Sequence, residues 1–96
     1  MEFVSILEAK APAIRALARS HRAANPRVFG SAARGRMTKD SDIDILVDAL
    51  PGATLFDLGG LQVDLEELLG AKVDLLTPQD ISSRFRDKVL AEARPI

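Results

Sequence analysis

Apolar residues recur along the chain with two different periods, and the change of period separates predicted helices from predicted strands. Between residues 3 and 21 the apolar positions follow helical spacing. Pro12 interrupts this spacing, so we expect a short first turn or helix and then a main helix with Pro12 near its start. Asn25-Pro26 favours an extended or turn conformation and ends the helical pattern, and a short strand is predicted around residues 27–29.

The clearest strand lies in the middle of the chain, where residues 42–48 read DIDILVD. Ile43, Ile45 and Val47 alternate with a second set of positions that is mostly acidic. Strict alternation predicts a strand whose odd-numbered side chains face the core. Aspartate is depleted in strands, so the acidic positions need an explanation.

Helix signals flank this strand on both sides. The segment SAARG predicts the first turn of a short helix, with Ser31 at or near its N-cap and Gly35 as its stop. After the strand, Thr54 and Asp57 have the spacing of a capping box and predict a helix that runs to about residue 69 and stops at Gly70.

The last third of the chain predicts one strand and one helix. The segment KVDLLT is a short strand with Val73 and Leu75 facing inward. Thr77-Pro78 is expected to cap the last helix. That helix has an apolar stripe, which is more typical of a core-facing surface than of an interface and consists of Ile81, Phe85, Val89 and Leu90.

This order of elements predicts one α/β domain over residues 1–96, with a small mixed sheet of three or four strands flanked by helices. The chain has 96 residues, of which 47% are hydrophobic, so a small core is within reach. Four Phe are the only aromatic residues, so that core must be mainly aliphatic.

Composition excludes several classes of protein. The formal net charge of −1 predicts neither direct DNA binding nor attraction to anionic membranes. The absence of Cys excludes disulfides and cysteine metal sites. No apolar run approaches the roughly 20 residues of a membrane-spanning helix, and the acidic N-terminus is unlike a signal peptide. We therefore expect a soluble, cytoplasmic protein.

Three aspartates are candidate metal ligands. Asp42 and Asp44 are separated by one residue, so a strand presents both on one face, roughly 7 Å apart at Cα. If the strands are neighbours, Asp74 joins them, and the three carboxylates suit Mg²⁺ or a two-metal phosphoryl-transfer site. The alternative is that the paired aspartates cap a turn or lie at a solvated sheet edge.

The turn before them has the composition of a phosphate site. Gly30 permits close approach of a ligand to the backbone, and the Ser31 hydroxyl can donate to a phosphate oxygen. Arg34 is a candidate to offset phosphate charge, whereas a solvated surface is favoured for Arg36 and Lys39. The alternative for the Gly-Ser pair is an ordinary helix cap.

These residues together are recognisable. The segment GSAARGRMTKDSDIDILV, with Gly-Ser, a ten-residue gap and Asp-x-Asp, resembles the signature of the DNA polymerase β-like nucleotidyltransferase superfamily. The GSxARG and SDIDILV segments and the later KVDLLTP are most similar to the minimal nucleotidyltransferases, or MNT proteins. MNT proteins are commonly encoded beside a HEPN-domain partner.

The resemblance implies a role for each matching residue. Gly30 and Ser31 would hold the triphosphate of ATP, Asp42 and Asp44 would bind two Mg²⁺ ions, and Asp74 would complete the metal site and assist deprotonation of the attacking hydroxyl. The reaction would be in-line attack on the α-phosphate with release of pyrophosphate.

The resemblance also implies an antitoxin that adenylylates a tyrosine of a HEPN toxin and forms a hetero-oligomer with it. This chain contains no Tyr, so the acceptor must lie on another protein. The competing interpretation is a non-catalytic antitoxin that neutralises the toxin by direct binding through the last helix. Transfer to a small molecule or to tRNA ends is disfavoured, because the chain lacks an acceptor domain and is nearly neutral.

Overall fold

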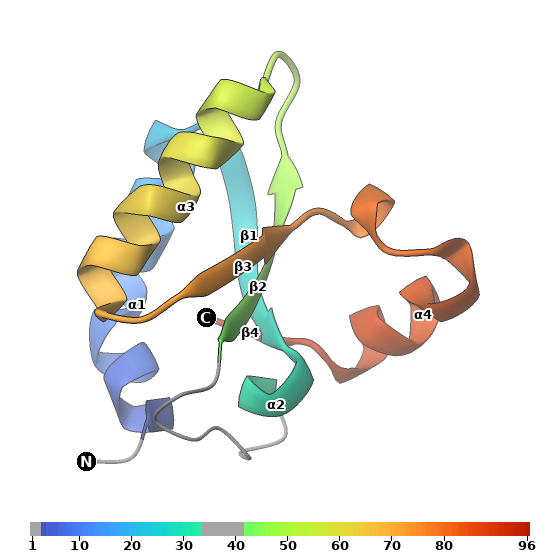
Figure 1. Cartoon of the computed structure of the whole chain (residues 1–96), viewed down its shortest axis with the longest axis horizontal. Coiled ribbons are helices and arrows are strands. Elements are labelled where there is room, and N and C mark those ends of the chain that lie inside the picture. The colour runs from blue at the N-terminus through green and yellow to red at the C-terminus, as the bar shows by residue number, and fades with distance from the viewer. Residues whose placement is uncertain (1–2, 34–41) are drawn as a thin grey trace.

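The computed structural model describes residues 3–33 and 42–96 (Figure 1). Helices and strands follow one another in the predicted order, with a short 3-10 helix and a fourth strand added near the end. The elements are α1 (Phe3–Ser20), β1 (Ala23–Phe29), α2 (Gly30–Ala33), β2 (Ile43–Ala49), α3 (Leu55–Leu69), β3 (Val73–Leu76), the 3-10 helix η1 (Pro78–Asp80), α4 (Ser83–Glu92) and β4 (Arg94–Pro95).

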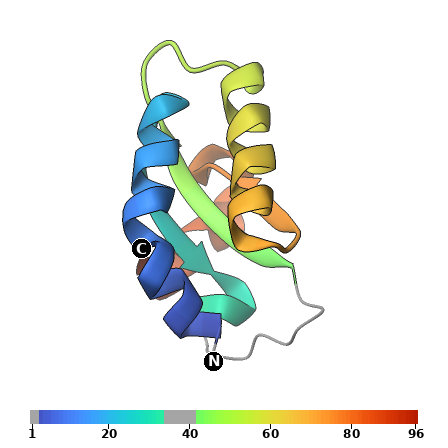
Figure 2. The same cartoon turned by 90° about the vertical axis from the view of Figure 1, so that its left-hand side faces the viewer.

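The four strands form one mixed sheet in the order β3-β2-β1-β4. β1 pairs antiparallel with β2 and with β4, whereas β2 pairs parallel with β3. The parallel pair is connected through α3, as a parallel crossover requires. α1 and α3 lie side by side over the sheet (Figure 2), while α4 stands to the other side of it (Figure 1). The predicted α/β fold class with a small mixed sheet is confirmed.

The core lies between the sheet and helices α1 and α3. Ile43, Ile45 and Val47 of β2 are fully buried there, which confirms the predicted alternation. Leu46 is also fully buried, although alternation places it on the opposite face, where η1 packs against β2. Both faces of β2 are therefore covered along the middle of the strand.

α1 is one continuous helix with Pro12 inside it, so the expected division at the proline is wrong. A proline inside a helix removes one backbone hydrogen bond and costs about 3 kcal/mol or more. Residues on both sides of it face the sheet and are buried, among them Leu7, Ala11, Ile14 and Ala18. Burial of that continuous apolar stripe offsets the cost of the proline, whose own side chain is exposed. The period of the apolar residues does not show which of these two free energies is larger.

β1 begins at Ala23, four residues earlier than predicted, and it runs through Asn25-Pro26. The pairing with β2 is irregular between Ala24 and Arg27, and Asn25 has a positive φ of 52°. The Asn25 side chain donates from Nδ2 to Asp48 Oδ2 at 2.8 Å, which ties the irregular segment to β2. A bulge of this kind accommodates a proline within a strand.

α3 has the predicted ends. Thr54 Oγ1 accepts from the Asp57 backbone N–H at 3.2 Å, and the Thr54 backbone N–H donates to Asp57 Oδ2 at 2.9 Å. The bond from the Thr54 backbone is the main reason that the pKa of Asp57 is below its ordinary value. Gly70 ends the helix with a positive φ of 64°.

We expect Thr54→Ala to reduce the free energy of unfolding by about 1 kcal/mol, because it removes the side-chain acceptor of the cap. Chemical denaturation of the variant measures this loss. Thr54→Ser keeps the hydroxyl and is the matched control, with stability close to that of the wild type. An equal loss in both variants would show that the capping hydroxyl is not the cause.

The last helix differs from its prediction. Thr77-Pro78 opens η1, and α4 starts later, with Ser82 as its N-cap. Arg86 fixes the connection by donating to the Pro78 and Ile81 carbonyls at 2.7 and 3.0 Å. α4 contains no buried residue; Phe85 is 56% and Leu90 is 38% exposed. The apolar stripe is thus not part of the core, because α4 packs on η1 and α2 and not on the main sheet face.

Candidate functional site

The parallel pairing of β2 with β3 brings two of the candidate carboxylates to adjacent positions. Asp44 lies directly opposite Asp74 in the register of the two strands. This pairing confirms that the two strands are neighbours, on which the inclusion of Asp74 depended. Asp42 lies immediately before β2 and is exposed, so it is not within the strand as expected.

The three carboxylates interact electrostatically. The pKa of Asp44 is raised above its ordinary value, first by partial burial and then by the negative charges of Asp74 and Asp42. No Lys, Arg or His of residues 3–33 and 42–96 forms an ion pair with Asp44. The site therefore concentrates negative charge that the described residues leave uncompensated.

Gly30 forms the wall of the site next to Asp44. It follows β1 directly, with a positive φ of 64°, and its neighbour Phe29 pairs with Asp44. A Cβ at this position would collide with Asp44 Oδ2. The missing side chain therefore lets the Asp44 carboxylate lie against the backbone of the turn, and the conformation is one that glycine adopts readily.

The structure describes the remaining candidate residues of the phosphate site less completely. α2 begins at Gly30, so Ser31 lies in its first turn, near the N-cap as predicted. Arg34, the third predicted nucleotide-binding residue, lies outside the described residues, and so do Gly35, Arg36 and Lys39.

The donor chemistry of the site fits a hard divalent cation. Carboxylate oxygens are the ligands that Mg²⁺ prefers, and a cation would relieve the repulsion that raises the pKa of Asp44. Within residues 3–33 and 42–96, however, no three acidic or histidine side chains already converge on one point as ligands. Binding would thus draw the carboxylates closer together.

His21 has a partner that the sequence does not reveal. Its Nε2 lies 2.7 Å from Asp64 Oδ2 on α3, and the ring packs beside Gly60, where a Cβ would lie 3.0 Å from Cε1. The half-buried ring joins the end of α1 to α3, and it takes no part in the carboxylate site.

The sequence profile described as "Nucleotidyltransferase domain" matches residues 13–96. The chain belongs to this nucleotidyltransferase family. The match includes the carboxylates, the Gly-Ser turn and every strand of the sheet. The resemblance to the minimal nucleotidyltransferases is therefore confirmed, and with it the enzyme class.

Individual relatives agree with the family. This nucleotidyltransferase is 47% identical to an inferred protein adenylyltransferase of Methanocaldococcus jannaschii over 66 residues, which cover 69% of the chain and 71% of the relative. An inferred minimal nucleotidyltransferase of known structure is 42% identical and has a TM-score of 0.89, with 97% of this chain and 95% of that chain covered.

A second solved structure is a toxin–antitoxin complex with AMP-PNP. It is 26% identical with a TM-score of 0.69, and the match covers 83% of this nucleotidyltransferase but only 66% of that longer chain. None of the helices in the described part of the chain is long and apolar enough to cross a membrane.

Proposed function

We propose that this nucleotidyltransferase transfers AMP from ATP, with Mg²⁺, to a tyrosine hydroxyl of a partner HEPN toxin and so acts as its antitoxin. The observation that carries the proposal is the placement of Asp44 opposite Asp74 and beside Gly30, with Asp42 near enough to raise the pKa of Asp44. A negatively charged site beside an open backbone turn suits a metal-bound triphosphate.

The three carboxylates would have different roles in holding the metal ions. Asp42 and Asp44 would hold two Mg²⁺ ions, and Asp74 would complete the set of ligands. Bound Mg²⁺ supplies compensation of the charge on the phosphate oxygens. The turn at Gly30, which lies against Asp44, would approach the triphosphate with its backbone, and the Ser31 hydroxyl would donate to a phosphate oxygen.

The transfer step forms one bond and breaks one. The acceptor oxygen attacks the α-phosphorus of ATP, and the bond from that phosphorus to the pyrophosphate oxygen breaks. Asp74 accepts the proton of the attacking hydroxyl, since it is the exposed member of the strand pair. Arg34 would offset charge on the departing pyrophosphate. Most of the catalysis comes from positioning and electrostatic stabilisation.

The acceptor must belong to another protein, because this chain has no tyrosine. Two relatives support the choice of ATP and of a toxin: one is an inferred protein adenylyltransferase, and one forms a toxin–antitoxin complex with AMP-PNP. A HEPN toxin follows from the resemblance to MNT proteins, and a hetero-oligomer in the cytoplasm, where ATP is available, is the expected assembly.

Two measurements test the proposal. We expect calorimetry to detect ATP binding that requires Mg²⁺ and is lost on addition of EDTA. We also expect radiolabelled ATP to label the toxin encoded beside this chain, with label resistant to denaturation. The double variant Asp42→Asn, Asp44→Asn should do neither. Label transfer by that variant would refute the assignment of the carboxylates.

The exposed stripe of α4 favours a second candidate function. Phe85 and Leu90 are exposed on a helix with no buried residue, and such a surface suits direct binding of a toxin. Under this alternative, the carboxylate double variant would still protect cells from the toxin, and Phe85→Ser would not. Protection that requires the carboxylates favours catalysis.

A further inference from the structure

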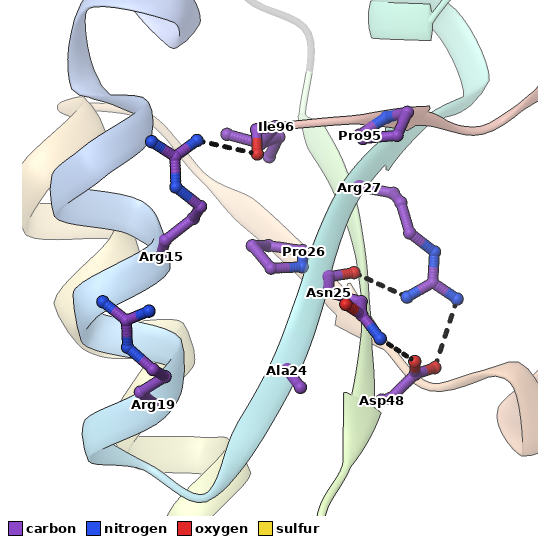
Figure 3. A pocket seen from close by; sticks show the side chains of 9 residues that line it. All are labelled: Arg15, Arg19, Ala24, Asn25, Pro26, Arg27, Asp48, Pro95 and Ile96. Carbon is purple, nitrogen blue, oxygen red and sulfur yellow. Dashed lines mark hydrogen bonds and ion pairs between the residues drawn. The ribbon is translucent and has the colours of Figure 1, made fainter.

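A groove runs between α1 and the outer edge of β1, away from the carboxylates. It consists of two adjoining hollows of about 610 and 470 Å³ that share Arg15, Pro95 and Ile96. Figure 3 shows the lining of the first hollow. β4 is only two residues long and pairs with Arg27 and Val28, so it leaves the earlier part of the β1 edge uncovered. We call these hollows the α1–β1 groove.

Arginines surround the groove. Arg15 and Arg19 project from successive turns of α1, with Arg27 across the β1 edge (Figure 3), and Arg94 lines the second hollow. The groove also contains two carboxylates, Glu8 and Asp48. Asp48 is already bound, by Arg27 Nη2 at 3.2 Å and by the Asn25 side chain.

The positive charge is available to a ligand. The side chain of Arg19 makes no hydrogen bond or ion pair with the described residues, and the side chain of Arg15 donates only to the Ile96 backbone oxygen, at 3.1 Å. The described lining contains four arginines and two carboxylates, so the groove has a local excess of positive charge in a chain whose formal net charge is −1.

The floor of the groove is apolar. Pro26 is buried at its centre, and the other apolar lining residues are Leu7, Ala11, Pro12, Ala24, Val28, Pro95 and Ile96. Among the described residues, no aromatic side chain lines either hollow, so this lining offers no ring on which nucleic-acid bases stack. Apolar contacts between arginines suit a peptide that carries both carboxylates and aliphatic side chains.

We propose that the α1–β1 groove binds an acidic, apolar segment of a partner protein. Carboxylates of the segment pair with Arg19 and Arg15, and its aliphatic side chains cover Pro26 and Ile96. Arginine and carboxylate form paired hydrogen bonds of defined geometry, which gives the contact specificity. The proposal does not depend on nucleotidyl transfer, because the groove shares no residue with the carboxylate site.

Fluorescence anisotropy with the full chain and a short fluorescein-labelled peptide of Glu and Leu tests this proposal. We expect saturable binding that weakens as salt is added. The double variant Arg15→Glu, Arg19→Glu should bind at least about tenfold more weakly, since it replaces attraction with repulsion at two contacts. Arg19→Gln should weaken binding less and leave the fold intact, because Arg19 has no partner among the described residues.

The matched control is Arg84→Glu, Lys88→Glu, which reverses two exposed charges with the same spacing on α4. Its affinity should equal that of the wild type. A peptide of Lys and Leu should not bind. The proposal is overturned by no binding to the wild type, by an equal loss in both double variants, by unchanged affinity of Arg19→Gln, or by tighter binding of single-stranded RNA to the same arginines.

Discussion

Asp44→Asn should abolish nucleotidyl transfer and at the same time make the protein more stable. Loss of a carboxylate that holds the metal should reduce the rate about a thousandfold, which is typical of removing one electrostatic contact in an active site. Stability should rise because Asp44 is partly buried beside Asp74 and Asp42, so its charge opposes folding in the absence of metal. Label transfer and thermal unfolding measure the two effects.

The sign of the pH dependence follows from the same residue. The pKa of Asp44 in the folded protein is raised above its ordinary value of 3.8, so the folded state binds the proton more tightly than the unfolded state. Its contribution therefore lowers the free energy of unfolding as the pH rises from about the ordinary value through the raised pKa. The gain in melting temperature for Asp44→Asn should be small in acid and reach its full size at neutral pH.

Glu67→Gln is the matched control, since Glu67 is an exposed carboxylate on α3, outside the site. It should retain full activity and wild-type stability. Addition of Mg²⁺ and ATP should stabilise the wild type and the control, but not Asp44→Asn. If Asp44→Asn were less stable than the wild type without metal, the electrostatic account of the site would be wrong.

Gly30→Ala should cause the second large effect, a loss of both stability and activity. A non-glycine residue in the left-handed conformation costs roughly 1–2 kcal/mol. At φ 64° the new Cβ would also collide with Asp44 Oδ2, so either the turn or the carboxylate must move. We expect the transfer rate to fall about a hundredfold, because a displacement of about 1 Å in an active site has that cost.

The variant Gly70→Ala separates the effect of backbone strain from the effect of a steric collision with Asp44. Gly70 has the same φ of 64°, but a Cβ there meets no atom within 4 Å. The variant should lose a similar roughly 1–2 kcal/mol from backbone strain and keep its activity. Chemical denaturation and label transfer on both variants make the comparison. Full activity in Gly30→Ala would mean that the close approach of the Asp44 carboxylate to the turn is not needed for catalysis.

Local signals in the sequence were sufficient wherever the deciding interactions are between neighbours. The capping box at Thr54, the left-handed stop at Gly70 and the alternation of Ile43, Ile45 and Val47 all appear as predicted. Each depends on groups within a few residues of one another, or on the period of a strand. The candidate site residues were also identified from the sequence, because their spacing matches a family signature.

Signals that oppose tertiary packing were misleading. Pro12 and Asn25-Pro26 are local breakers, yet α1 and β1 continue through them because the flanking residues pack on the sheet or pair with β2. The apolar stripe of α4 was misleading in a different way, because it predicted a core-facing helix. Its period is helical, but periodicity does not say what covers a face, and here no residue of α4 is buried.

The sequence by itself determined the α/β class, the order of the main elements and the set of residues that carry the candidate chemistry. Only the tertiary structure decided that Asp74 lies opposite Asp44, that Gly30 has no room for a side chain, and that the arginines of α1 and β1 line one groove. The reason is physical: strand register, steric exclusion and charge segregation are relations between segments far apart in the chain, and they arise only when the core brings those segments together.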